Sequence, residues 1–599
     1  MCGITAYCGN GEALPFLIQG LAKLEYRGYD SAGVTVLNNV LTTVKCKGRL
    51  KNLEEKLKDH DMTGHVGIGH TRWATHGIPS NLNSHPHTNP SNTISIVHNG
   101  IIENYRELKD ILLEKGYSFQ SETDSEVVVM CLDYFYEGDL LEAVKKTLNC
   151  IDGSYALCIV STEHPDEVVV AKKASPLVIG RTEDASVAAS DIPALLAYTK
   201  DVYFLDDLEM AVLKKDSITF YNKDGEEITK EMTTIPYDME AAQKNGFDTY
   251  MLKEINEQPH VIQETLRGRI FEHSIVLDEL KDVDFNKFNK VYYVACGTAY
   301  HAGLCGASIL ERATRLPVLT QVASEFRYND PIIDEKTLCI FVSQSGETAD
   351  TLAALKLANE KGCTTIAVTN VLGSTISREA QYTLYTCAGP EIAVASTKAY
   401  TTQLVLLTLI ALYIADKRGD SVDTDLMEQL NNLREYVSKL IDDEAIFENY
   451  AKALKDKHDC YFIGRSLDYA SVLEGALKLK EVSYVHADAY IAGELKHGPI
   501  ALIEPGTVVI AVATQPHVAA KTISNIQETI ARGAEVILFT VEGQEVSGVE
   551  NIYCLPDINP LLQSVLVAIP LQLIAYHTAC IKGCDVDKPR NLAKSVTVE

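Results

Sequence analysis

The second half of this chain alternates short apolar strands with helical stretches, and this alternation strongly limits how it can fold. The apolar run Val291–Ala295 leads into a glycine-containing loop and a helix. Leu338–Val342 leads into a second loop and a helix that should end at Gly362, before the strand-like run Thr365–Val368. Because parallel strands need long, usually helical, connections, the pattern predicts a doubly wound parallel sheet with helices on both faces.

This pattern occurs twice, with an offset of roughly 170 residues. Tyr461–Arg465 matches the strand and glycine that begin the first copy, and Val508–Val512 matches Leu338–Val342. Two domains of the same fold are therefore expected. The copies differ after this second strand, where the first has Ser343–Thr348 and the second has Ala513–Pro516. We expect only the first copy to retain phosphate-binding chemistry.

The first part of the chain has short β-branched runs separated by Gly, Thr and His. Examples are Ser95–Val97, which precedes His98-Asn99-Gly100, and Glu167–Ala171. These runs favour an α+β domain with a sheet-based core. A weakly patterned segment containing Pro236 and Gly246 indicates a linker. The chain should thus comprise a first domain, a linker, two α/β domains and a C-terminal tail, with boundaries at 2–232, 233–248, 249–440, 441–584 and 585–599.

Length and composition indicate a multidomain, soluble protein. A chain of 599 residues is too long for a single core. The net charge of −28 argues against nucleic acid or an anionic membrane as a partner. The 15 cysteines form no CxxC pairs and no apolar leader precedes them, so we expect reduced thiols in a cytoplasmic protein. The apolar stretches Leu404–Ala415 and Leu561–Cys580 are interpreted as buried helices.

Met1-Cys2-Gly3 places a thiol where processing can create an amino terminus beside it. Removal of Met1 would leave the Cys2 sulfur next to its own α-amino group, whose unperturbed pKa is about 7.7–8.0. One residue could then supply both a nucleophile and its base. The alternative, an ordinary small apolar cysteine near a terminus, is favoured if this triplet is considered alone.

Four further residues supply what hydrolysis of the glutamine side chain requires. The Asn99 side chain and the Gly100 backbone N–H could stabilise an oxyanion. Arg72 offers a fork for an α-carboxylate, and Asp124 offers a counter-charge for an α-ammonium group. Singly, these residues also fit an Asn-Gly turn, a surface arginine and a helix cap. Together with Cys2, they predict a glutaminase site.

The first domain also contains a group of histidines that could suggest a metal site: His70, His76, His85, His87 and His98. Their spacing does not match a helical pair of ligands, and no cysteine or carboxylate accompanies them. We expect packing and hydrogen bonding instead of metal binding.

In the first α/β copy, Ser343–Thr348 follows a strand and precedes a helix, which suits a phosphate site; a Ser-rich helix cap is the alternative. In the second copy, Lys478 and Glu481 lie three residues apart in Leu473–Ser483, on one face of an expected helix. Taken alone, this spacing is better explained by an exposed ion pair. A proton transfer between two carbons of a ketose would need a base such as Glu481.

These motifs carry a resemblance that extends over nearly the whole chain. The first domain is similar to the class II, N-terminal-nucleophile (Ntn) glutamine amidotransferases. The complete chain resembles the glutamine–fructose-6-phosphate aminotransferases, in which two sugar isomerase (SIS) domains follow the glutaminase domain. The matching signatures are Cys2–Ile4, Glu25–Gly33, His70–Gly77, Ser343–Asp350, Ala395–Tyr400, Leu473–Ser483, Gly493–Pro499 and Asp585–Glu599. The resemblance implies an αββα glutaminase fold followed by two doubly wound parallel sheets.

The resemblance also implies roles in the first domain. Cys2 would be the nucleophile, and Asn99 and Gly100 would form the oxyanion site. Trp73, the only tryptophan of the chain, would be a gate between two active sites. The residues implied to hold glutamine are Arg72, Thr75, His76 and Asp124.

In the SIS domains, the resemblance implies that Glu481, with Lys478 beside it, carries a proton between carbons of the sugar. His497 would assist ring opening, and Lys594 would form a Schiff base with the ketone. Ala299 stands where many relatives have serine, which puts one sugar or phosphate contact in doubt. The implied sugar-phosphate ligands are Thr298, Ser343, Gln344, Ser345, Thr348, Val394, Ser396 and Ala593.

The implied reaction converts D-fructose 6-phosphate and L-glutamine into D-glucosamine 6-phosphate and L-glutamate, with ammonia channelled between the two sites. This reaction begins amino-sugar biosynthesis. We expect no metal, no cofactor, no nucleic-acid or membrane partner, and a homodimer. Two alternatives remain: an amidotransferase that acts on another sugar phosphate, and a sugar-phosphate sensor without catalysis. For the first, the intact Cys2, Arg72 and Asp124 count against a deglycase-like relative that has lost the glutamine half. Glu481, His497 and Lys594, together with the whole first domain, count against the second.

Overall fold

The computed structural model describes residues 2–74, 76–235, 243–271, 274–420, 423–543 and 546–597. These residues divide into two compact units. Unit 1 contains the described residues up to 235 together with 593–597, and unit 2 contains those from 243 to 592.

Two antiparallel sheets form the centre of unit 1. The first has eight strands, in the order β15 (Thr233–Thr234), β11 (Asp201–Phe204), β9 (Val178–Arg181), β10 (Ala185–Ala189), β1 (Gly3–Gly9), β4 (Val66–Arg72), β2 (Ser31–Asn38) and β3 (Val40–Lys47). The second has seven, in the order β14 (Glu227–Ile228), β13 (Ser217–Tyr221), β12 (Met210–Lys214), β8 (His164–Lys173), β7 (Gly153–Ser161), β6 (Ile94–Ile102) and β5 (His87–Thr88).

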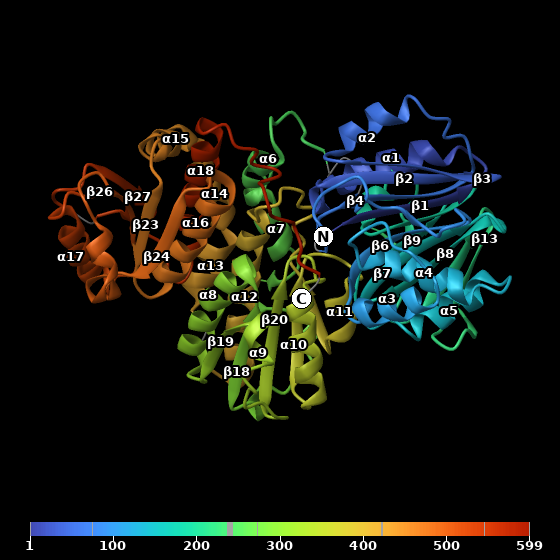
Figure 1. Ribbon diagram of the computed structural model, residues 1–599. Coiled ribbons are helices and arrows are strands. Elements are labelled where there is room, and N and C mark those ends of the chain that lie inside the picture. The colour runs from blue at the N-terminus through green and yellow to red at the C-terminus, as the bar shows by residue number, and fades with distance from the viewer. Residues whose placement is uncertain are drawn as a thin grey trace. The chain divides into compact units, whose positions relative to one another are not determined.

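Helices cover the outer faces of these two sheets, so unit 1 has four layers. Ile4, Ile68, Val97 and Cys158 belong to the apolar core between the sheets. The two groups of helices lie on opposite sides of the sheets (Figure 1): α1 (Ala13–Leu24) and α2 (Leu50–Leu57) on one side, and α3 (Tyr105–Glu114), α4 (Ser125–Phe135) and α5 (Leu140–Leu148) on the other. The expected αββα architecture is confirmed.

Strand β6 extends further than the β-branched run Ser95–Val97 alone indicates. It continues through Asn99, which lies opposite Ala156 of β7, and through Gly100. Gly100 has a φ of +133°, and a Cβ atom there would lie 2.0 Å from the Ser154 carbonyl oxygen. Glycine at this position therefore allows the strand to continue, and Asn99 is held by a sheet rather than by a loop.

Unit 2 contains two parallel sheets of five strands each. The first has the order β19 (Val318–Val322), β18 (Lys290–Ala295), β20 (Thr337–Ser343), β21 (Thr364–Thr369) and β22 (Tyr382–Tyr385). The second has the order β24 (His486–Ile491), β23 (Asp459–Gly464), β25 (Val508–Ala513), β26 (Glu535–Val541) and β27 (Asn551–Leu555). The strand order repeats between the sheets, so the predicted duplication is confirmed.

Four long helices pack together between these two sheets and join their cores: α8 (Gly297–Thr314), α12 (Lys398–Arg418), α16 (Leu467–Ser483) and α18 (Gln563–Ile581). The other α-helices and strands described in unit 2 are α6 (Tyr250–Asn256), α7 (Gln258–Leu266), β16 (Ile270–Phe271), β17 (Ser274–Ile275), α9 (Ala323–Phe326), α10 (Ala349–Glu360), α11 (Thr375–Glu379), α13 (Thr424–Asn431), α14 (Leu433–Asp442), α15 (Glu444–Ala451) and α17 (Ala519–Ile530).

Helices α12 and α18 are long and apolar enough to cross a membrane, but they are core helices. Their most apolar windows are 94% and 83% buried inside the protein. The interpretation of Leu404–Ala415 and Leu561–Cys580 as buried helices is thus confirmed.

The expected linker is only partly described. Its first residues, Thr233 and Thr234, pair with β11 as the edge of the first sheet. Pro236 lies outside the described residues, and α6 begins at Tyr250. The backbone N–H groups of Tyr250 and Met251 donate to the Asp587 carboxylate, so the start of the C-terminal tail caps this helix.

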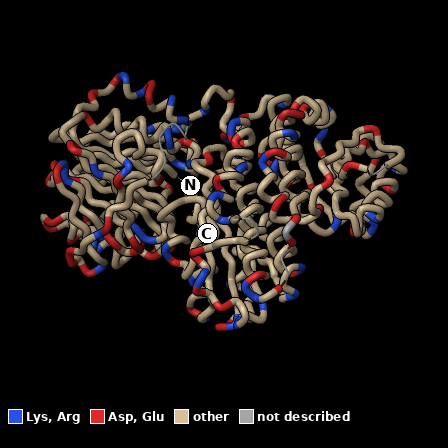
Figure 2. The backbone as a smooth tube through the Cα atoms, turned by 180° about the vertical axis from the view of Figure 1, so that it is seen from behind, with Lys and Arg blue, Asp and Glu red and all other residues tan. Residues whose placement is uncertain are grey.

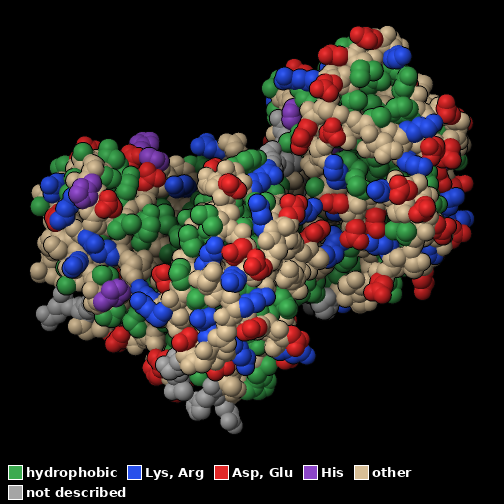
Figure 3. Space-filling view, turned by 90° about the horizontal axis from the view of Figure 1, so that it is seen from below, with side chains coloured by type: hydrophobic (Ala, Val, Ile, Leu, Met, Phe, Trp, Pro, Cys, Tyr) green, Lys and Arg blue, Asp and Glu red, His purple; other side chains and the backbone are tan. Residues whose placement is uncertain are grey.

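Charged residues of both signs are interspersed along the described backbone (Figure 2). The face seen from below shows the same mixture (Figure 3). On the face shown in Figure 3, the basic side chains form no continuous patch.

Candidate active sites

The candidate glutaminase site lies at one end of the two sheets of unit 1. Cys2 immediately precedes β1, and Arg72 ends the neighbouring strand β4, with Gly3 paired to Thr71. Asn99 comes from β6 of the facing sheet, and Asp124 directly precedes α4. The fold therefore brings four predicted site residues to one region from four separate segments.

The Cys2 thiol is held by the backbone of Trp73. The Trp73 N–H donates to Cys2 Sγ at 3.3 Å, and the thiol lies 3.6 Å from the Trp73 carbonyl oxygen. Burial raises the pKa of the Cys2 thiol. A thiol with a raised pKa stays protonated near neutral pH, so attack by its sulfur requires a neighbouring base.

Asn99 is oriented by His70, a residue for which the sequence predicted only packing and hydrogen bonding. His70 Nε2 lies 3.1 Å from Asn99 Oδ1 and 3.0 Å from the His98 carbonyl oxygen. Both neighbours are acceptors, so we assign the ring proton to Nε2. Burial lowers the pKa of His70 to about 3, which keeps the ring neutral. The Asn99 amide nitrogen consequently faces Cys2 and donates to its carbonyl oxygen at 2.9 Å.

Arg72 is buried with one terminal nitrogen occupied and the other available. Nη2 donates to the carbonyl oxygens of His76 and Gly77. Nη1 is buried and has no hydrogen-bond partner among the described residues. A buried donor without a partner is costly, and a substrate carboxylate would satisfy it.

The other residues predicted to hold glutamine have different surroundings. One Asp124 oxygen accepts the Ile102 N–H at 2.8 Å. The His76 ring packs edge-on against Tyr105, with 5.3 Å between the ring centres. Trp73 is partly buried. Thr75 lies outside the described residues.

The remaining histidines pack behind this site. The His85 ring lies 4.1 Å from that of His70 and 4.6 Å from that of His87. Burial lowers the pKa of His85 and His87 well below the usual range. Within the described residues, no group of three or more histidine, cysteine or acidic side chains is arranged to hold a metal ion.

In unit 2, the loop after β20 is organised around its own hydroxyl groups. Ser343 Oγ accepts the Gly346 N–H at 3.0 Å and lies 3.3 Å from Thr348 Oγ1. Ser345 Oγ accepts the Glu347 N–H at 3.2 Å. Thr348 directly precedes α10, and its side chain makes no capping hydrogen bond to the helix. The loop thus presents hydroxyl groups at the positive end of a helix, as expected for a phosphate site.

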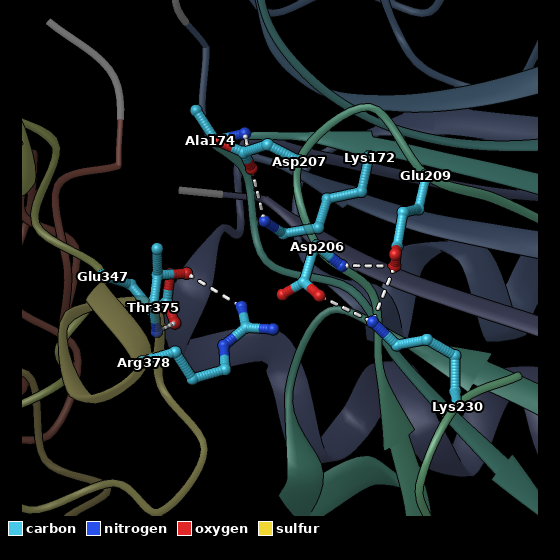
Figure 4. A network of polar contacts seen from close by, with 9 residues as sticks. All are labelled: Lys172, Ala174, Asp206, Asp207, Glu209, Lys230, Glu347, Thr375 and Arg378. Carbon is cyan, nitrogen blue, oxygen red and sulfur yellow. Dashed lines mark hydrogen bonds and ion pairs between the residues drawn. The ribbon is translucent and has the colours of Figure 1, made fainter. Parts of the chain in front are cut away.

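Glu347 fixes this loop to the neighbouring helix α11. Its carboxylate accepts the Thr375 N–H at 2.7 Å and the Thr375 hydroxyl at 2.8 Å. Arg378 donates to the same hydroxyl at 3.5 Å (Figure 4). The sequence did not single out this carboxylate, whose contacts position the loop.

The first turn of α8 in the first copy meets α16 of the second in a buried charged cluster. Lys478 Nζ lies 2.6 Å from Glu481, 3.3 Å from Glu474 and 3.0 Å from Thr298 Oγ1. Glu474 also accepts the Thr298 hydroxyl at 3.1 Å and lies 2.8 Å from His301 Nδ1. Burial acts to lower the pKa of Lys478, but the two carboxylates outweigh it and hold the pKa above its usual value.

This cluster contains predicted and unpredicted residues. The expected helical face is confirmed by the contact between Lys478 and Glu481, whereas their roles stay predictions. Glu474 and His301 were missed. Glu474 lies four residues before Lys478, so the same helical spacing could have identified it.

The other predicted sugar residues are more widely distributed. Ser396 donates to Glu391 at 2.8 Å, and the Val394 N–H donates to the Asp587 carbonyl oxygen at 3.0 Å. His497 ends a short 3₁₀ helix and is exposed, and its side chain has no hydrogen bond or ion pair to other described residues. Ala593 and Lys594 group with unit 1, and their roles stay predictions.

Comparison with known proteins assigns both units. A glutamine amidotransferase domain matches residues 70–197, and an SIS domain matches residues 284–413 and again 453–582. A protein named glutamine–fructose-6-phosphate aminotransferase [isomerizing] from Clostridium tetani is 54% identical, and the match covers 100% of both chains. The chain belongs to the glutamine–fructose-6-phosphate aminotransferase family. A relative of the same name from Thermus thermophilus is 44% identical, again over 100% of both chains.

A solved structure of this family resembles unit 2. The C-terminal domain of glucosamine-fructose-6-phosphate aminotransferase from Francisella tularensis is 38% identical, with a TM-score of 0.56. The similarity covers 58% of this chain and 99% of the other. The family predicted from the sequence motifs is therefore confirmed.

Proposed function

We propose that this chain transfers the amide nitrogen of L-glutamine to D-fructose 6-phosphate and isomerises the product to D-glucosamine 6-phosphate, releasing L-glutamate. This is the first step of amino-sugar synthesis. The full-length relatives carry the name of this reaction. The observation on which the proposal depends is the Asn99 amide, oriented by His70 and placed 2.9 Å from the Cys2 carbonyl oxygen.

In the glutaminase unit, removal of Met1 would free the α-amino group of Cys2 to accept the thiol proton. The sulfur then attacks the side-chain carbonyl carbon of glutamine. Asn99 Nδ2 and the Gly100 N–H stabilise the oxyanion that forms. Collapse of this intermediate expels ammonia, which takes up the proton, and water hydrolyses the thioester to glutamate.

Arg72, Asp124 and His76 would hold the substrate during this reaction. The buried Nη1 of Arg72 would donate to the α-carboxylate, and the Asp124 carboxylate would pair with the α-ammonium group. Both substrate charges are then neutralised in a desolvated site, and free glutamine is distinguished from glutamine within a peptide.

In unit 2, the loop Ser343–Thr348 would hold the phosphate of the sugar. Lys594 would form a Schiff base with its ketone, which ammonia displaces. Glu481 would then remove a proton from C1 and return it to C2. The Lys478 cation beside Glu481, at 2.6 Å, would hold the carboxylate in position for the first transfer and receive it again after the second.

His497 would assist opening of the sugar ring. Because it is exposed and unpaired within the described part of the chain, we propose that it acts in a homodimer, at the site of the partner subunit. Ammonia would pass between the sites without entering bulk water, where it would be protonated, and Trp73 would gate this route. We place the reaction in the cytoplasm.

One assay separates this proposal from its alternatives. The purified chain is incubated with glutamine and fructose 6-phosphate, and glucosamine 6-phosphate is measured by mass spectrometry. We expect product from the wild type and none from Cys2→Ala. Formation of a different amino sugar from another sugar phosphate would assign a different substrate, and binding of the sugar without any product would indicate a sensor. Retention of Met1 on active protein would overturn the role of Cys2.

A further inference from the structure

The second parallel sheet of unit 2 has a loop with the same position as the phosphate loop of the first. This second loop surrounds a side chain of the protein itself. β20 and β25 occupy the same place in their sheets, each between two strands of the same order. Each is followed by a loop and then by a helix that begins six residues after the strand ends. Thr514 and Gln515 therefore correspond to Gln344 and Ser345 of the first copy.

In the second copy, the donors of this loop are already occupied by the Asp468 carboxylate. Oδ2 accepts the Thr514 N–H at 2.8 Å and the Gln515 N–H at 3.3 Å. Oδ1 accepts the Thr514 hydroxyl. Asp468 is only 2% exposed, so these contacts are shielded from water.

Asp468 occupies a position with a clear counterpart in the first copy. It lies four residues after β23 ends at Gly464, in the first turn of α16. Four residues after β18 ends at Ala295, in the first turn of α8, the first copy has Ala299. At the position that faces the loop, the first copy therefore has the methyl group of Ala299, and the second has the carboxymethyl group of Asp468.

We propose that the Asp468 carboxylate is a built-in anion that occupies the phosphate-binding loop of the second SIS domain and so restricts sugar-phosphate binding to the first. This inference rests on the proposed function in one respect: it takes Ser343–Thr348 as the phosphate loop.

Two physical effects would exclude a phosphate from the second loop. Its N–H and O–H donors are already used by Asp468, and a second anion would be placed beside the first in a desolvated site. Gln515 also closes the loop, because its side-chain nitrogen donates to the Pro560 carbonyl oxygen at 2.9 Å. Burial raises the pKa of Asp468 to about 6, so the group is still ionised above neutral pH.

The same reasoning predicts what removal of the carboxylate would create. Thr514 and Gln515 would then have free backbone donors at the start of the loop. An inorganic phosphate or a phosphate ester could therefore replace the carboxylate as the bound anion.

The test uses reciprocal substitutions in the full-length protein. Asp468→Ala gives the second copy the side chain of the first, and Ala299→Asp gives the first copy a carboxylate. At pH 8, we expect wild type to bind one inorganic phosphate per chain and Asp468→Ala to bind two. We expect Ala299→Asp to weaken fructose 6-phosphate binding at least 100-fold relative to Ala299→Asn, which matches it in size. Isothermal titration gives both quantities, and thermal unfolding checks that each variant is folded.

The outcomes distinguish this inference from the proposed function. If wild type binds fructose 6-phosphate but folded Asp468→Ala gains no second phosphate, the inference is wrong. Equal sugar binding by Ala299→Asp and Ala299→Asn would also overturn it. If wild type itself fails to bind fructose 6-phosphate, the proposed function fails first. Should Asp468→Ala not fold, the Ala299 pair still decides the question.

Discussion

Both units bury polar residues beside their candidate sites, but the buried residues are neutral in unit 1 and charged in unit 2. In unit 1, His70 is neutral, and it orients the neutral amide of Asn99. In unit 2, Lys478 is a buried cation held between Glu474 and Glu481. A neutral hydrogen bond can be replaced by another donor of similar shape, whereas one partner of a buried ion cluster cannot be removed without leaving a charge unpaired.

This difference suits the chemistry proposed for each unit. Negative charge develops on the glutamine oxygen only in the transition state, so neutral donors fixed in advance can stabilise it without charge in the resting site. A proton carried between two carbons requires a base that is ionised before the reaction starts. The charged cluster keeps Glu481 beside a cation for this purpose.

The largest effect should come from Lys478→Met, which leaves the buried Glu474 carboxylate and the partly buried Glu481 carboxylate without their cation. We expect the free energy of unfolding of unit 2 to fall by about 3–5 kcal/mol. Lys480→Met is the matched control on the same helix. Lys480 is exposed, and its ion pair with Asp488 at 3.4 Å should contribute less than about 1 kcal/mol. Urea unfolding measures both variants, and equal losses would contradict the role given to burial.

The next effect should come from Asn99→Ala, which removes a neutral donor from unit 1. We expect kcat for glutamine hydrolysis to fall about 10²–10³-fold, equivalent to about 2.7–4 kcal/mol, with little change in KM. Stability should change less than in Lys478→Met. Steady-state release of glutamate in the presence of fructose 6-phosphate provides the measurement. A rise in KM with unchanged kcat would assign Asn99 to substrate binding instead.

The parts of this comparison that the sequence predicts are local ones. Strands of the parallel sheets are continuous apolar runs because both faces are buried, and the observed strands β18, β20, β23 and β25 contain them. The spacing of Lys478 and Glu481 likewise predicts a shared helical face, and the two side chains are in contact at 2.6 Å.

The missed contacts join segments that are distant in sequence. Glu474 meets Thr298 across 176 residues, His70 meets Asn99 across 29, and Asp468 meets Thr514 across 46. Each depends on how a helix or strand packs against another, and no local periodicity encodes that. The extension of β6 through Asn99 was missed for a similar reason, because His98-Asn99-Gly100 is typical of a turn, whereas pairing with β7 makes it a strand.

A smaller effect should appear as pH dependence at Asp468. Burial raises its pKa from 3.8 to about 6. The folded state therefore binds the proton more tightly than the unfolded state. The stabilisation that comes from this tighter proton binding is complete below about pH 4 and is lost as the pH rises through 6. Relative to Asp468→Asn, wild type should lose up to about 3 kcal/mol of unfolding free energy between pH 4 and pH 7. Parallel pH curves from urea unfolding would show that the Asp468 pKa is the same in both states.

The smallest effect should come from His70→Gln, and it is the sharpest test of the neutral site in unit 1. The Gln side-chain nitrogen can take the place of His70 Nε2 and donate to Asn99 Oδ1, so kcat should stay within about threefold of wild type. His70→Leu keeps the apolar volume but removes the donor. The Asn99 amide is then free to rotate and present its oxygen to the oxyanion, and kcat should fall more than about tenfold.

A readout that a general loss of structure would not produce comes from comparing two ligands. Glutamate binding reports the ground state, and the aldehyde analogue of glutamine, which forms a tetrahedral adduct with Cys2, reports the oxyanion. In His70→Leu, only binding of the aldehyde should weaken. If binding of both ligands weakens equally, His70 supports the shape of the pocket. The claim that unit 1 depends on a neutral side chain that orients Asn99 would then be wrong.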